Sequence, residues 1–169
     1  MIFVGYMVSN SGIGMDLAKV SFVLDWPVPK SVKDVQSFLG FANFYRKFIL
    51  GYSTLTSPLT DLTRKAARKF FDIEGRCFVP PAAACFHIRS LQHFQPDLPL
   101  TIEADASDYA LCCILSQPSP QGNLHSVCYY SRKFSAAELN YPTYDKELLA
   151  VVAGFKQWRV YVEGARFPV

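Results

Sequence analysis

The chain has 169 residues, of which 50% are hydrophobic and 15% aromatic, and its formal net charge is +3. This composition excludes an intrinsically disordered chain, and the longest apolar stretches fall far short of the roughly 20 residues that span a membrane. The opening MIFVGYMV has neither the basic start nor the small-residue cleavage site of a secretory signal. We therefore expect an intracellular protein, cytoplasmic or nuclear, that does not enter a membrane.

The five cysteines form an odd set without a C-x-x-C motif, and two of them are adjacent. Adjacent cysteines bridge each other only with strain, so we interpret the set as reduced, mostly buried thiols. A zinc site built from Cys77, Cys85, His87 and His93 is the alternative, although this spacing matches no common zinc motif.

Positive charge is concentrated in the first half of the chain. Residues 1–80 hold ten Lys or Arg against six acids, whereas residues 81–169 hold seven against eight. The densest basic cluster is RKAARK, residues 64–69. Such a cluster can neutralise phosphates, but a solvated helix end is the alternative that charge alone favours.

The chain begins with a short apolar strand or hairpin that ends near the turn signal SNSG, residues 9–12. A helix follows over residues 16–25, with Asp16 placed to cap its first turn. The sequence WPVPK then ends this helix because proline removes a backbone donor.

A second helix is predicted from Ser31 to Leu50, with Asp34 as the approximate partner of a capping box and Gly51 as its end. One of its faces is apolar and comprises Val35, Phe38, Leu39, Ala42, Tyr45 and Ile49. We interpret the aromatic stripe beside this face, Phe41, Phe44 and Phe48, as core, with stacking on nucleic-acid bases as the alternative. A third helix in LTSPLTDLTRK, with Pro58 in its first turn, completes a compact, basic module.

Residues 66–98 show no clean period and are interpreted as a connector. From Leu100 onward apolar and polar residues alternate, which predicts a strand with Glu103 and Asp105 on the same face. Residues 110–117 and 126–132 are rich in strand-forming residues and predict two further antiparallel strands.

After the third strand the period changes to that of a helix, from Pro142 to Gly164. We predict that its core-facing side comprises Tyr144, Leu148, Val151, Val152, Phe155 and Val162. The fold class is therefore α+β: a small helical module followed by a truncated α/β domain of three antiparallel strands and a helix.

Two acids in this second part are candidate metal ligands. Asp105 lies at a strand end and Glu147 lies on the helix expected to pack over the same sheet. Nucleases that use two divalent ions need several carboxylates that hold the ions about 4 Å apart. The alternative is that the Glu147 side chain is solvated and has no ligand role, as is usual for glutamates on helices.

Four segments closely resemble the pol polyprotein of gypsy-type LTR retrotransposons, in the same order and over nearly the whole chain. They are DLAKVSFVLDWPVPKSVKDVQSFLGFANFYRKFI, EADASDYALCCILSQ, HSVCYYSRKFS and ELNYPTYDKELLAVVAGFKQWRVYVEGA. The resemblance implies the end of the palm hairpin at residues 1–15 and reverse transcriptase thumb-like helices at 16–65. It further implies a degenerate connector at 66–98 and the N-terminal half of a ribonuclease H-like domain at 99–169.

The resemblance also implies roles for particular residues. Asp105 and Glu147 match the first aspartate and the helical glutamate that bind Mg²⁺ or Mn²⁺ and catalyse hydrolysis of RNA in RNA–DNA hybrids. Contacts with the hybrid or with a template–primer duplex are implied for Lys33, Arg46, Lys47, Arg64, Lys65, Arg68 and Lys69. The rest of a pol polyprotein is the other implied partner.

The family's remaining catalytic motifs do not occur in this sequence. Its Tyr-x-Asp-Asp polymerase motif would precede Met1, and its Thr-Asp-His-Lys nuclease motif would follow RFPV. Within the matched region, Cys112 replaces a usual glycine and Phe167 a usual histidine. We expect a reverse transcriptase and ribonuclease H fragment that is inactive alone; the alternatives are a non-catalytic nucleic-acid-binding module and a decaying open reading frame.

Overall fold

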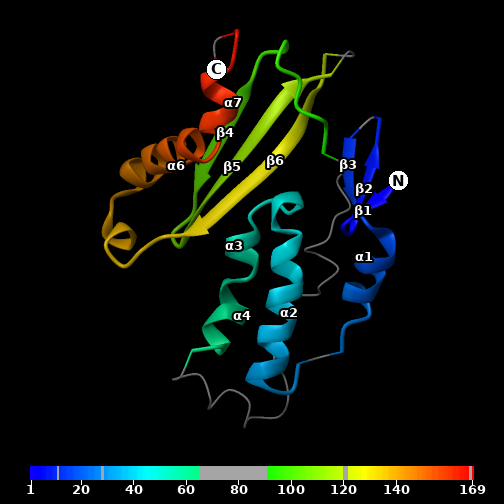
Figure 1. The fold of residues 1–169 in the computed structure, drawn as a ribbon. Coiled ribbons are helices and arrows are strands. Elements are labelled where there is room, and N and C mark those ends of the chain that lie inside the picture. The colour runs from blue at the N-terminus through cyan, green and yellow to red at the C-terminus, as the bar shows by residue number, and fades with distance from the viewer. Residues whose placement is uncertain (11, 28, 65–90, 120–121, 168) are drawn as a thin grey trace.

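The computed structural model describes residues 1–10, 12–27, 29–64, 91–119, 122–167 and 169 (Figure 1). Most of the expected connector lies outside the described residues, together with Lys65, Arg68 and Lys69. Cys77, Cys85 and His87 of the alternative zinc site also lie outside them.

The elements form two modules, and the predicted α+β class is confirmed. The N-terminal module comprises β1 (Ile2–Phe3), β2 (Tyr6–Ser9), β3 (Gly12–Met15), α1 (Leu17–Leu24), α2 (Val32–Phe44), η1 (Arg46–Phe48), α3 (Tyr52–Leu55) and α4 (Ser57–Leu62). The C-terminal module comprises β4 (Thr101–Ala106), β5 (Ala110–Pro118), β6 (Leu124–Lys133), η3 (Glu138–Asn140), α6 (Thr143–Gln157) and α7 (Arg159–Glu163).

The N-terminal sheet is an antiparallel meander of β1, β2 and β3, which extends the predicted hairpin by one strand. A pair of backbone hydrogen bonds, each 2.8 Å, joins Ile13 to Leu91 of the segment that leads into β4. The approach is so close that a Cβ atom on Gly12 would lie 2.1 Å from the Leu91 carbonyl oxygen. Glycine is thus required where the two modules are tied together.

The predicted caps of the first two helices are confirmed. The Asp16 carboxylate accepts a hydrogen bond from the Ala18 N–H at 3.1 Å, and the Ser31 hydroxyl accepts one from the Asp34 N–H at 3.2 Å. The Asp34 carboxylate in turn accepts from the Lys30 N–H at 3.0 Å. These side chains satisfy backbone donors that have no partner within the helix.

The second helix is shorter than predicted. It ends at Phe44 instead of Leu50, and η1 follows as a tighter turn. The turn is associated with Tyr45, whose buried ring packs on Tyr6 and whose hydroxyl donates to the Gly5 carbonyl at 2.9 Å. Gly51, with φ of 64°, starts α3 instead of ending α2.

The core of the N-terminal module is centred on the predicted face of α2. Five of its six residues are buried, namely Val35, Phe38, Ala42, Tyr45 and Ile49. The aromatic stripe is divided: Phe48 is buried, whereas 45% of Phe44 is exposed. Pro58 lies in the first turn of α4, as predicted.

The second sheet is antiparallel with the order β4-β5-β6, and α6 covers one of its faces (Figure 1). The Cys113 thiol of β5 donates to the Ala150 carbonyl at 3.3 Å. A Cβ atom on Gly154 would lie 3.3 Å from both the Cys113 sulfur and Ile102 Cγ2. Small residues therefore let the helix lie directly on the sheet.

The predicted core-facing side of this helix is wrong. Tyr144 and Leu148 are 70% and 61% exposed, and Val151, Val152 and Phe155 are also exposed. The buried helix positions are Ala150 and Gly154. The physical reason is the close helix–sheet approach, which has no room for the large apolar side chains of the opposite face.

The N-terminal module packs on the other face of the second sheet. The Ser131 hydroxyl on β6 accepts a hydrogen bond from the Ser53 N–H at 3.0 Å, and Tyr129 is buried in the core of the N-terminal module. The Lys133 ammonium lies 3.5 Å from the Ser57 carbonyl oxygen. In the described ranges, none of the helices combines the length and apolar character needed to cross a membrane.

Candidate nucleic-acid interface and carboxylate pair

Strand β4 presents Glu103 and Asp105 on the face away from α6, so the predicted shared face is confirmed. Both line a hollow of about 420 Å³ that Leu50 and Leu55 help to enclose. Asp105 pairs with Cys112 across the sheet, and its Oδ1 accepts a hydrogen bond from the Ala106 N–H at 2.9 Å. Burial raises the pKa of the Cys112 thiol, and the negative charge of Asp105 raises it further.

Glu147 is exposed on α6, one helical turn before Ala150. The contacts of Ala150 and Gly154 with the sheet fix the direction of the helix. Gly154 lies beside Ile102, and Ala150 lies over Cys113, which pairs with Ala104. Helix α6 therefore runs antiparallel to β4.

This direction brings the two candidate ligands to the same end of the module. Asp105 is three strand residues beyond Ile102, about 10 Å, and Glu147 is seven helical residues before Gly154, also about 10 Å. The two residues nevertheless lie on opposite sides of the sheet. Ile102 and Ala104 of β4 face α6, so Asp105, which alternates with them, points away from the helix that carries Glu147.

The donor chemistry suits a hard divalent ion, since carboxylate oxygens are the ligands that Mg²⁺ and Mn²⁺ prefer. The number of ligands does not suit a two-ion site. In the part of the chain that the structure describes, no three Asp, Glu, His or Cys side chains lie close enough to hold a metal ion. We therefore assign no hydrolytic step to this chain's residues alone.

The predicted phosphate-binding residues divide into two kinds. Lys33, Arg46 and Lys47 are exposed, and among the described residues none of them pairs with an acid. Arg64 is exposed but lies 3.4 Å from the Asp61 carboxylate, which partly neutralises it. Among the described residues, Arg46 and Lys47 are thus unpaired cations of the N-terminal module that lie close to β6.

A second hollow, of about 560 Å³, lies beside these two cations. Its other walls come from the N-terminal sheet, from Leu91 and Gln92, from β6 and from the junction of α6 and α7. Its aromatic lining comprises Tyr6, Phe48, Tyr129, Tyr130, Trp158 and Tyr161. The sequence analysis did not bring these lining residues together. No periodicity or motif connects them, because the lining runs from Tyr6 to Tyr161, about 155 positions apart, and meets only in the folded chain.

Comparison with known proteins decides the family. Residues 83–169 match the RNase H-like domain found in reverse transcriptase. The chain belongs to this family. RNase H-like domains generally use a divalent metal ion, which agrees with the oxygen ligands although the described residues do not assemble a site.

The retrotransposon resemblance is confirmed by curated relatives. The Transposon Tf2-3 and Tf2-4 polyproteins of Schizosaccharomyces pombe are each 36% identical over 174 aligned positions. The alignments cover 98% of this chain but 12% of each polyprotein. The chain therefore corresponds to one part of a retrotransposon polyprotein that carries the RNase H-like domain.

Solved structures share the fold across both modules. The foamy viral protease–reverse transcriptase dRH in complex with double-stranded DNA has a TM-score of 0.73 at 19% identity, covering 95% of this chain and 28% of that one. The foamy viral protease–reverse transcriptase in complex with RNA/DNA hybrid has a TM-score of 0.70 at 20% identity, covering 94% and 22%. The helical module and the RNase H-like sheet thus recur together in one arrangement.

Proposed function

We propose that this chain is the part of a retrotransposon reverse transcriptase that joins its thumb-like helices to its ribonuclease H-like domain. In the longer protein it binds an RNA–DNA hybrid or a template–primer duplex and contributes Asp105 and Glu147 to cleavage of the RNA strand. The observation that carries the proposal is the position of these two carboxylates at the same end of β4 and α6. The other ligands come from the rest of the polyprotein.

Two further observations support a nucleic-acid partner. The foamy viral proteins that share the fold were solved with double-stranded DNA and with RNA/DNA hybrid. In addition, Lys33, Arg46 and Lys47 are exposed without an acidic partner among the described residues. Such cations release counterions from phosphates when they bind, which is the main source of sequence-independent affinity.

The test of catalysis uses a labelled RNA strand in an RNA–DNA hybrid with Mg²⁺ or Mn²⁺. We expect no cleavage by the 169-residue chain, and metal-dependent cleavage by a longer polyprotein that includes it. Asp105→Asn and Glu147→Gln should each abolish that cleavage while hybrid binding remains. Glu103→Gln is the matched control, because Glu103 shares the face of Asp105. Cleavage that survives both substitutions would refute the assignment.

The test of binding is the salt dependence of hybrid affinity for the 169-residue chain. Removal of one phosphate contact, for example by Lys47→Gln, should reduce the slope of log K against log salt by about 0.9. Arg64→Gln should have a smaller effect, because Asp61 already compensates its charge. Binding with a steep slope but without cleavage in any context would favour the non-catalytic binding module instead.

A further inference from the structure

The hollow of about 560 Å³ lies along β6, an outer strand of the second sheet. Its volume falls within the range of roughly 300–1,000 Å³ that is typical of ligand pockets. Three kinds of side chain in its lining carry the argument: the cations Arg46 and Lys47, aromatic rings, and the amide of Gln92, which is one of two amides there. Each kind of side chain offers an interaction that the described residues do not complete.

The cations are Arg46 and Lys47 of η1. Both are exposed, and neither pairs with an acid in the described ranges. The Lys47 charge acts on the Cys128 thiol in the wall of the hollow, where it opposes the rise in pKa caused by burial. This side of the hollow therefore suits an anion.

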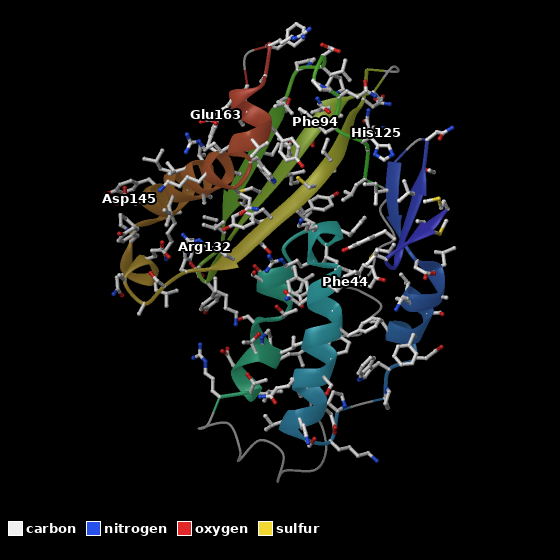
Figure 2. All side chains as sticks on the ribbon, viewed as in Figure 1. Phe44, Phe94, His125, Arg132, Asp145 and Glu163 are labelled. Atoms are coloured by element: carbon white, nitrogen blue, oxygen red, sulfur yellow. The ribbon has the colours of Figure 1, made fainter. Side chains whose placement is uncertain are left out.

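Three of the aromatic rings in its lining, Tyr130, Trp158 and Tyr161, come from β6 and from the junction of α6 and α7; the others are Tyr6, Phe48 and Tyr129. Tyr130 and Trp158 pack edge to face with their ring centres 6.4 Å apart, and Tyr161 packs on Phe94 at 4.7 Å. Figure 2 shows Phe94 beside the end of the second sheet, close to α7. Tyr130 and Tyr161 are partly exposed and provide a surface for a flat, polarisable group, whereas Trp158 is buried.

The amide belongs to Gln92. Its Oε1 is buried and has no hydrogen-bond partner among the described residues. A buried acceptor without a donor costs about 1–3 kcal/mol. A ligand with an N–H group would remove that cost, whereas a purely apolar ligand would not.

We propose that this hollow binds one unpaired nucleotide of the nucleic acid held by the chain. The base stacks on Tyr130 and Tyr161 and donates an N–H to Gln92, while Arg46 and Lys47 hold its phosphate. A small inorganic anion would contact Arg46 and Lys47 but not the aromatic rings. A neutral peptide would contact the rings but not the two cations. The inference rests on the proposed function, since it specifies which part of the nucleic acid this site receives.

The test compares two RNA–DNA hybrids of equal paired length, one blunt and one with two unpaired nucleotides at one end. Stacking of a base on an aromatic ring corresponds to at least about fivefold in affinity, so the tailed hybrid should bind at least about fivefold more tightly. In the Trp26→Phe variant Trp158 is the single tryptophan. The Trp158 ring contacts Tyr130, so its fluorescence should then change with the tailed hybrid and not with the blunt one.

Tyr161→Leu and Gln92→Leu should each reduce the advantage of the tailed hybrid and leave blunt-hybrid affinity unchanged. Tyr144→Leu is the matched control, because Tyr144 is an exposed aromatic on α6 that does not line the hollow. Equal affinity for both hybrids, or an advantage that persists in both variants, would overturn this inference and leave the proposed interface intact. Failure to bind either hybrid at any salt concentration would overturn both.

Discussion

The ion pair between Arg132 and Glu138 fixes the turn that leads from β6 toward α6. The Arg132 guanidinium donates two hydrogen bonds to the Glu138 carboxylate, at 2.8 and 2.9 Å, and the Ser135 N–H donates a third at 2.7 Å. Figure 2 shows Arg132 near the end of β6. These donors lower the pKa of Glu138 to about 2, with the Arg132 hydrogen bonds as the main cause.

We predict that Glu138→Gln lowers the free energy of unfolding by about 1–2 kcal/mol at pH 7. The pKa shift corresponds to at most about 3 kcal/mol, and solvent reduces this value because the Arg132 side chain is 35% exposed. Urea unfolding measures the change. The matched control is Glu163→Gln, whose ion pair with Arg159 is 74% and 61% exposed. That substitution should change stability by less than about 0.5 kcal/mol.

The pH dependence gives a second measurement of the same pair. A carboxylate with a depressed folded-state pKa contributes stability above its unfolded pKa of about 4.3 and loses it as the pH falls toward about 2. The difference between wild type and Glu138→Gln should therefore be constant from pH 5 to 8 and shrink between about pH 4 and 2. A difference that persists at pH 2, or one equal to that of Glu163→Gln, would refute the reasoning.

Three other substitutions or reactions test the packing of the two modules. Gly12→Ala should destabilise the fold by about 1–3 kcal/mol because its Cβ meets the carbonyl oxygen of Leu91, whereas Gly14→Ala, which meets nothing within 4 Å, should not; thermal unfolding compares them. Leu148→Gln should change the free energy of unfolding by less than about 0.5 kcal/mol, because Leu148 is exposed, while Ala150→Leu should lower it by about 1–3 kcal/mol. The opposite result would mean that the large apolar face predicted from the sequence packs on the sheet. Burial raises the pKa of Cys113 to about 11, so iodoacetamide at pH 8 should modify it only after unfolding, as peptide mass spectrometry would show.

The error on α6 shows the limit of hydrophobic periodicity. The sequence ELLAVVAGFKQW offers two apolar faces, one of large side chains and one of small ones. Counting apolar area selects the large face, but the sheet accepts Ala150 and Gly154 because the Cys113 thiol and Ile102 leave no room for more. On α2 no such competition exists, and the predicted face was confirmed.

The sequence by itself determined the local structure and the family. Caps at Asp16 and Ser31 and the alternation that begins at Leu100 are local properties, set by residues a few positions apart, whereas the order of the retrotransposon-like segments can be read directly along the chain. Only the tertiary structure decided which side of α6 meets the sheet, that Asp105 faces away from that helix, and that η1, Gln92 and α7 enclose one hollow. These features depend on distances between segments far apart in the chain, and such distances are set by the packing of whole side chains, which a one-dimensional pattern does not contain.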